Sequence, residues 1–174
     1  MTLPADENAG SPDLLAIYLN DHFAGATGGV ELFKRAAQSH GGAERNALVE
    51  LARQVEEDRE ALAQVMADLG VPVDRPKAAV GWIAEKAGRL KPNGHLFSRS
   101  PLSDVLEAES ALLGVQGKAA CWRTLRALSE TDARLSTERL DALVERAEDQ
   151  ILTLENIRLC AATRTFRSLP SSTP

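Results

Sequence analysis

Four long segments of the chain repeat apolar residues at intervals of three and four positions, which is the period of an amphipathic α-helix. We expect helices over residues 12–38, 43–69, 103–128 and 136–163. These segments are rich in Ala, Leu, Glu and Arg, which favour helices, and the sequence shows no sustained alternation of β-branched residues. The pattern predicts an all-α protein.

Polar and glycine-containing stretches mark the ends of the expected helices. Residues 11–13 (Ser-Pro-Asp) form a start signal, and Ser103 and Ser136 are expected N-caps. The first helix stops before the HGG stretch at 40–42, and the second is closed by Gly70. We therefore expect two antiparallel hairpins, one from the first two helices and one from the last two.

A long connection rich in Pro, Gly and Lys joins the two hairpins and encloses a short amphipathic helix around residues 77–90. Two hairpins joined by one long link are the arrangement of a four-helix bundle with a single crossover. We expect residues 12–166 to form this bundle as one domain. The flanking residues 1–11 and 167–174 are expected to be flexible tails.

Three stretches along this order of helices carry a resemblance to a known superfamily: LNDHFAGATGGVELF (19–33), VEEDREAL (55–62) and VERAEDQ (144–150). Together with the element order, they resemble the ferritin-like superfamily, most closely its small uncharacterised bacterial members. The resemblance covers nearly the whole chain and rests on element order and texture. It implies a ferritin-like four-helix bundle.

The resemblance also implies where a metal would bind. Di-iron members take a Glu from each of two helices and a Glu-x-x-His pair from each of the other two. This sequence has no Glu-x-x-His, and if Asp58 and Glu148 took the glutamate places, Ala61 and Ile151 would stand in the histidine places. We therefore predict no metal or other cofactor, with iron or another divalent metal at a degenerate site of His22, Asp58 and Glu148 as the alternative.

Polar residues interrupt the apolar stripe of each expected helix. Asp58 stands at the centre of an otherwise aliphatic seam, and His22 lies in the apolar face of the first helix at nearly the same height. We expect these two side chains to meet, most simply in a hydrogen bond that fixes helix register. The expected buried cluster is His22, Asp58, Gln116 and Glu148, and the expected second polar layer, about two turns away, is Glu109, Glu155 and Arg158.

Glycines inside the first helix need an explanation, because each costs about 1 kcal/mol relative to Ala. Gly25 and Gly29 lie one turn apart on the edge of the apolar face. We interpret them as positions where a neighbouring helix approaches closely. The alternative is a polar or ligand site that needs the space.

Composition narrows the function classes. A net charge of −5 disfavours nonspecific nucleic-acid binding, although residues 77–99 carry five basic side chains against one acid, which suits a solvated surface or an anionic partner. No apolar run approaches the length of a membrane span, and Cys121 and Cys160 are in no CxxC arrangement, which suits reduced thiols, so we expect a cytoplasmic protein. Nucleotide-binding, hydrolase and zinc motifs are missing from the sequence.

Three hypotheses for the function remain. The first is a non-catalytic, self-associating helical module, expected to be a homodimer that packs through the face of helix 12–38 and the Trp122 side of helix 103–128. The second is a metal-binding or redox protein related to iron-dependent oxidases. The third is a binder of an anionic or hydrophobic small molecule at the crossover.

Overall fold

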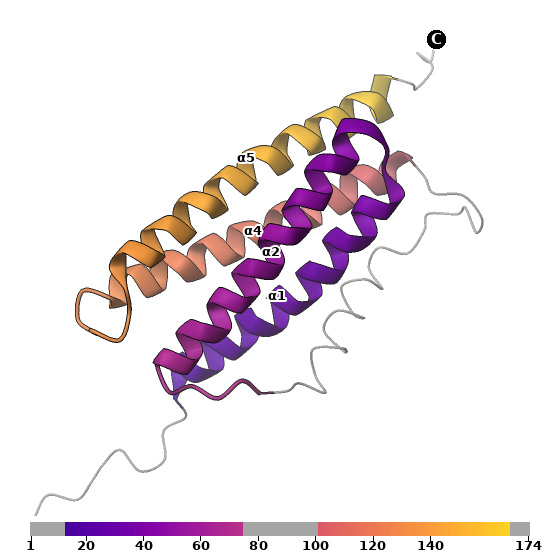
Figure 1. Ribbon diagram of the computed structural model, residues 1–174. Helices are drawn as coiled ribbons and strands as arrows, with labels where there is room; N and C mark the ends of the chain where they lie inside the picture. Colours follow the sequence, from indigo (N-terminus) through magenta and orange to yellow (C-terminus); the bar gives the residue numbers. More distant parts are fainter. Residues whose placement is uncertain (1–12, 75–100, 168–174) are drawn as a thin grey trace, which may run out of the picture.

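The computed structural model describes residues 13–74 and 101–167, and these two ranges hold four long helices (Figure 1). The helices are α1 (Leu14–Ser39), α2 (Gly42–Asp68), α4 (Pro101–Leu128) and α5 (Thr137–Arg167). The described ranges contain no strand, so the all-α prediction is confirmed. The short helix expected around 77–90 and the expected tails, apart from Arg167 at the end of α5, lie outside them. None of the described helices is long and apolar enough to cross a membrane.

Local side-chain chemistry sets the starts of the helices. Asp13 caps α1, because its Oδ1 accepts hydrogen bonds from two backbone N–H groups of the first turn at 3.0 and 3.1 Å. Ser136 Oγ accepts from the backbone N–H of Arg139 at 3.3 Å, as expected for the cap of α5. The prediction for α4 is wrong by two residues, because the helix begins at Pro101 and Ser103 lies inside it. The C-terminal ends of α1 and α2 lie within one residue of the predicted ones, whereas α5 continues beyond its predicted end to Arg167.

Gly70 ends α2 in a left-handed conformation with φ of +74°. The backbone N–H of Val71 donates to the carbonyl of Met66 at 2.8 Å, and that of Gly70 donates to the carbonyl of Ala67 at 3.0 Å. This pair of hydrogen bonds is the Schellman motif, which requires the positive φ that glycine tolerates. Val71 then turns back into the core, where it is buried.

The four helices form two antiparallel hairpins that pack side by side (Figure 1). α1 packs against α2 and α4, and α5 packs against α4 and α2. At one end of the bundle, His40 Nε2 lies 3.8 Å from Asp104 Oδ1. At the other end, Arg134 Nη1 in the turn between α4 and α5 donates to the carbonyl of Leu69 at 3.0 Å. α2 and α4 therefore run in the same direction, as expected for a single crossover.

The hydrophobic core consists of two clusters, one toward each end of the bundle. Toward the turn between α4 and α5, the members include Leu19, Met66, Trp122, Leu125 and Leu140. Toward the turn between α1 and α2, they include Val30, Phe33, Leu48, Leu51 and Leu154. Two buried polar residues, Asp58 and Gln150, stand between the clusters in sequence on their helices. The centre of the bundle is therefore polar.

The glycines of α1 are not explained by close packing among the four helices. A Cβ placed on Gly25 would meet no described atom within 4 Å. One placed on Gly29 would meet Val55 Cγ1 at 3.7 Å, an ordinary van der Waals distance. Our interpretation of both positions as sites of close helix approach is therefore wrong within the described residues.

Gly29→Ala should stabilise the protein. The new methyl group fits beside Val55, and alanine gains up to about 1 kcal/mol of helix propensity over glycine. Urea unfolding followed by circular dichroism measures the change. A free energy of unfolding lower than that of the wild type would mean that α1 and α2 approach more closely than the 3.7 Å contact indicates.

Candidate functional site

Asp58 is the starting point of the site because it is a carboxylate at the centre of an apolar stripe. Along α2 the buried residues Val55, Asp58, Leu62 and Val65 follow one another at three- and four-residue spacing. The side chain of Asp58 is only 2% exposed. An isolated carboxylate in such surroundings would cost several kcal/mol, so its position requires partners from other helices.

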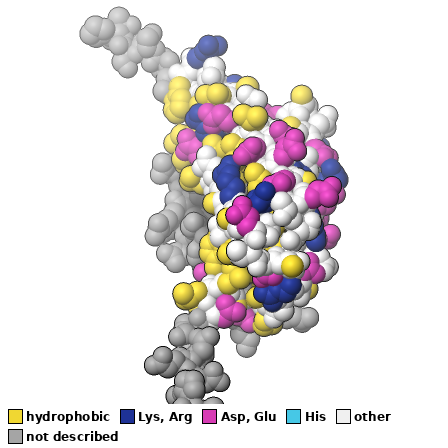
Figure 2. Space-filling model, turned by 90° about the vertical axis from the view of Figure 1, so that its left-hand side faces the viewer, with side chains coloured by type: hydrophobic (Ala, Val, Ile, Leu, Met, Phe, Trp, Pro, Cys, Tyr) yellow, Lys and Arg dark blue, Asp and Glu magenta, His cyan; other side chains and the backbone are white. Residues whose placement is uncertain are grey.

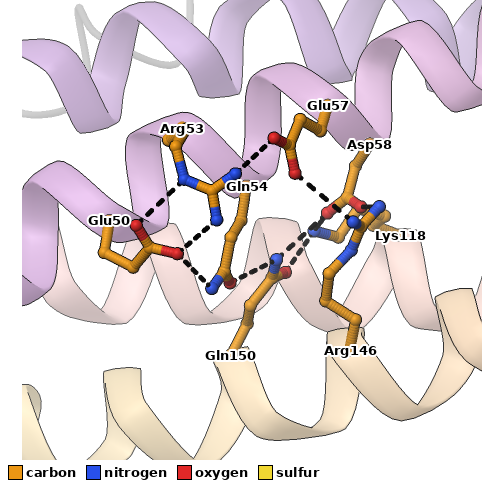
Figure 3. A network of polar contacts seen from close by, with 8 residues as sticks. All are labelled: Glu50, Arg53, Gln54, Glu57, Asp58, Lys118, Arg146 and Gln150. Atoms are coloured by element: carbon orange, nitrogen blue, oxygen red, sulfur yellow. Dashed lines mark hydrogen bonds and ion pairs between the residues drawn. The ribbon is translucent and has the colours of Figure 1, made fainter.

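Three side chains from α4 and α5 surround the Asp58 carboxylate (Figure 3). Lys118 Nζ of α4 donates a hydrogen bond to Asp58 Oδ2 and forms an ion pair with it. Gln150 Nε2 of α5 donates to the same oxygen at 3.1 Å. Arg146 Nη2 of α5 forms an ion pair with Oδ1. We call Asp58, Lys118, Arg146 and Gln150 the central polar layer.

Gln150 connects the members of the central polar layer to one another. Its side chain is buried, and its Oε1 accepts a hydrogen bond from Lys118 Nζ. Its Nε2 also donates to Gln54 Oε1 of α2 at 3.1 Å. A single amide thus contacts α2 twice and α4 once, and satisfies both its donor and its acceptor.

The layer continues to the surface along α2 (Figure 3). Gln54 Nε2 donates to Glu50 at 2.9 Å, and Arg146 Nη1 lies 3.5 Å from Glu57 Oε2. Arg53 pairs with both Glu50 and Glu57. Hydrogen bonds from Arg53 and then from Gln54 lower the pKa of Glu50 to about 2. Because these outer groups are in contact with solvent, their ion pairs contribute little to the free energy of unfolding.

The charges of the layer are unevenly matched. Lys118 and Arg146 bring two positive charges to the single carboxylate of Asp58, with Glu57 nearby on the solvent side. Burial lowers the pKa of Lys118 from its ordinary value of 10.5, the Asp58 carboxylate opposes this, and Arg146 adds to it. Desolvation therefore outweighs the attraction of the carboxylate at Lys118.

Of the four residues expected in a buried cluster, only Asp58 is buried. His22 is half-buried on α1, where its ring packs edge-on against Tyr18 with centroids 4.5 Å apart. It is not among the hydrogen-bond or ion-pair partners of Asp58 described above. Burial lowers the pKa of His22, and Asp21 partly opposes this shift. The predicted His22–Asp58 contact is corrected accordingly, since equal height along the bundle does not fix which way a side chain points.

Gln116 and Glu148 are exposed, which corrects the other half of the expected cluster. Glu148 accepts a hydrogen bond from Arg123 at 2.9 Å, and both side chains are about half exposed. The reason is a rotation of α4 and α5 relative to our expectation. The residues that take the inner positions are Lys118 and Gln150.

A sequence signal for these two residues does exist. Lys118 follows Val115 by three positions and precedes Trp122 by four, and both neighbours are buried. Gln150 stands in the same way between the buried residues Ala147 and Leu154. Each therefore interrupts an apolar stripe as Asp58 does.

The second polar layer comes together at the surface. Arg158 Nε donates to Glu155 Oε2 at 2.7 Å, and Arg158 Nη1 lies 3.9 Å from Glu109 Oε1. The two carboxylates are 39% and 45% exposed, so the three residues form a surface ion-pair network that links α4 to α5.

The candidate metal ligands His22, Asp58 and Glu148 are not gathered into one site. Among residues 13–74 and 101–167, no group of three or more His, Cys, Asp or Glu side chains is placed to hold a metal ion. The carboxylate of Asp58 is instead occupied by Lys118 and Arg146. Two fixed positive charges at this position oppose the entry of a divalent cation.

No protein-family model, curated protein or solved structure matches this chain. The class of the protein is therefore defined by what its own fold and site show. Over residues 13–74 and 101–167 it is an all-helical protein whose four long helices enclose a buried ion-pair layer.

Removing Asp58 should be strongly destabilising, because it leaves Lys118 and Arg146 without their buried counter-charge. We expect Asp58→Ala to cost about 3–5 kcal/mol of the free energy of unfolding. The double variant Asp58→Leu with Lys118→Met should cost less than the sum of the two single changes by about 1 kcal/mol or more. Urea unfolding of the four proteins in this cycle measures the coupling.

The exposed Lys34–Glu56 ion pair, at 3.1 Å between α1 and α2, is the matched control. Its side chains are 44% and 39% exposed, so the same cycle there should give a coupling below about 1 kcal/mol. Additive effects at Asp58 and Lys118 would contradict the buried pair.

Proposed function

We propose that the protein is a ferritin-like helical bundle that acts as a non-catalytic, self-associating module, most simply as a homodimer. In this proposal the central polar layer occupies the bundle core, where di-iron members of that superfamily carry their metal ligands. Two observations support it: the internal ion pairs of Asp58, and the exposed apolar rows on the outside of the bundle.

The central polar layer supports a structural role for the middle of the bundle. Its one buried carboxylate is taken up by side chains of the chain itself, and the buried Gln150 has partners for both its donor and its acceptor. A catalytic carboxylate needs an open position for a substrate or a metal. The central polar layer therefore supports a role in fixing the register of the helices and not a role in catalysis.

The observation that carries self-association is a set of exposed apolar residues on the α4–α5 hairpin. They recur at seven-residue spacing, which keeps each row on one side of its helix. The α4 row is Leu106 and Leu113, and the α5 row is Leu152, Leu159 and Phe166. The contact between Glu109 and Arg158 brings the two rows level with each other.

The surface of the bundle has both charged and hydrophobic regions. Charged side chains of both signs cover much of the face in Figure 2, and hydrophobic side chains gather along its left margin. Leu113 is 69% exposed, Leu152 65% and Phe166 54%, so the rows leave large side chains in contact with water. Apolar rows of this kind are typical of helices that pack against a second molecule.

The surface expected from the sequence needs one correction. Trp122 is only 1% exposed and belongs to the core, so the Trp122 side of α4 is not available for an interface. We assign the interface instead to the outer side of α4, which carries Leu106 and Leu113, together with α5.

The two alternative functions have less support. The residues offered as a degenerate iron site are dispersed, so no described group favours the redox hypothesis. A small-molecule site at the crossover would involve residues 77–99, which lie outside the described ranges.

Self-association should depend on the two apolar rows. The wild type is expected to be a dimer at tens of micromolar, and Leu113→Glu combined with Leu159→Glu should weaken the dimer by about tenfold or more because each Glu would bury a charge. Multi-angle light scattering over a dilution series measures this. Val49→Glu on α2 is the matched control, since Val49 is 51% exposed and lies outside the rows. A monomeric wild type, or equal weakening by the control, would contradict the proposal.

A further inference from the structure

A groove runs along the outer side of the α1–α2 hairpin, where the two helices lie side by side (Figure 1). Its volume of about 380 Å³ lies within the range of about 300–1,000 Å³ that is typical of small-molecule sites. Residues three or four positions apart line it, so the residues from each helix share one side of that helix. From α1 these are Lys34, Ala37 and Gln38, and from α2 they are Arg45, Val49, Ala52, Arg53 and Glu56.

Two short side chains form the floor of the groove. Ala37 of α1 and Ala52 of α2 are both buried, so they lie where the two helices face each other. Because neither side chain extends beyond its Cβ, a hollow remains between the helices at this level. Val49 stands beside this floor and is half exposed. The groove therefore presents apolar surface that water does not solvate well.

The groove is lined by three cations and one acid, and two of the cations are already paired. Lys34 Nζ lies 3.1 Å from Glu56 Oε1. Arg53 is paired with two carboxylates of α2 that do not line the groove. Arg45 has no ion pair and no side-chain hydrogen bond within the described parts of the chain. One guanidinium is therefore open to a single negative charge.

Arg45 stands at one end of the groove, close to the turn between α1 and α2. It belongs to the first turn of α2, which begins at Gly42. Glu56 lies about three helical turns, or about 16 Å, further along the same helix. Its ion pair with Lys34 crosses from α2 to α1 at that end. A ligand with its charge at Arg45 would therefore place the rest of its length on the apolar floor.

The order of these groups indicates the chemical class of the ligand. A guanidinium binds a carboxylate through two parallel hydrogen bonds. The single open charge of Arg45 matches a monoanion, whereas a polyanion would leave further charges beside apolar surface without partners. The apolar side chains next to Arg45 match a ligand that carries an apolar chain. Both features together describe an amphipathic monocarboxylate.

We propose that the groove between α1 and α2 binds a small amphipathic monocarboxylate. The carboxylate pairs with Arg45, and the apolar chain lies on Ala37, Val49 and Ala52. Because the groove is open to solvent, binding is weak and reversible, with a dissociation constant on the order of a millimolar for a chain of eight carbons. The site lies on other helices than the apolar rows of the α4–α5 hairpin, so it does not depend on the proposed self-association.

Octanoate is the probe that tests the proposal on the full chain. In a titration followed by ¹H–¹⁵N NMR, it should shift the amide signals around Val49 and Ala52. Arg45→Gln should weaken octanoate binding by about tenfold, because the ion pair is lost. Arg59→Gln removes the same charge from α2 outside the groove and should keep the wild-type affinity. Acetate carries the charge without the chain and should bind at least about tenfold more weakly than octanoate.

A charge reversal at the same position is the second variant. Arg45→Glu should exchange the preference of the groove, so that octylammonium binds more tightly than octanoate. Arg45 is exposed, so circular dichroism should show unchanged helices in both variants. Equal affinity of octanoate for the wild type and for Arg45→Gln would overturn the proposal. Shifts confined to the apolar rows of the α4–α5 hairpin would also overturn it, because they would assign octanoate to that surface instead.

Discussion

The ion pair between Asp58 and Lys118 is the interaction on which the arrangement of the helices depends. A carboxylate in the middle of an apolar seam is tolerated only where opposite charge and hydrogen-bond donors reach it. Lys118 must come from α4, and Gln150 and Arg146 must come from α5. Sliding or turning either helix would leave the carboxylate unpaired. The pair therefore selects one register and divides the hydrophobic core into two clusters.

This constraint leaves the outside of the bundle as the surface that a partner can reach. The Asp58 carboxylate at the centre is held by Lys118, Arg146 and Gln150, whereas the outer surface carries apolar rows on the α4–α5 hairpin. These rows expose groups that water does not solvate well. Their chemistry suits contacts with the helices of a second molecule.

The sequence predicts the elements of this fold better than it predicts their rotation. The apolar period places the four described helices, the start signals at Asp13 and Ser136 mark the starts of α1 and α5, and the interrupted seam of α2 points to Asp58. The rotation of α5 is not determined, because Gln150 and Ile151 stand side by side in broad apolar arcs and either can face inward. Lys118 escapes notice because a long charged side chain is expected to reach the surface.

The titration of Lys118 tests the buried ion pair most directly. Burial lowers the pKa of Lys118 in the folded protein below 10.5. Between the folded and the unfolded pKa, the unfolded chain therefore binds more protons than the folded one. The contribution of Lys118 to the free energy of unfolding rises with pH through that window. NMR of ¹⁵N-labelled lysine should show one ammonium group that exchanges slowly, loses its proton before the other lysines and is missing from Lys118→Met. A Lys118 signal that titrates together with the other lysines at about 10.5 would contradict the account.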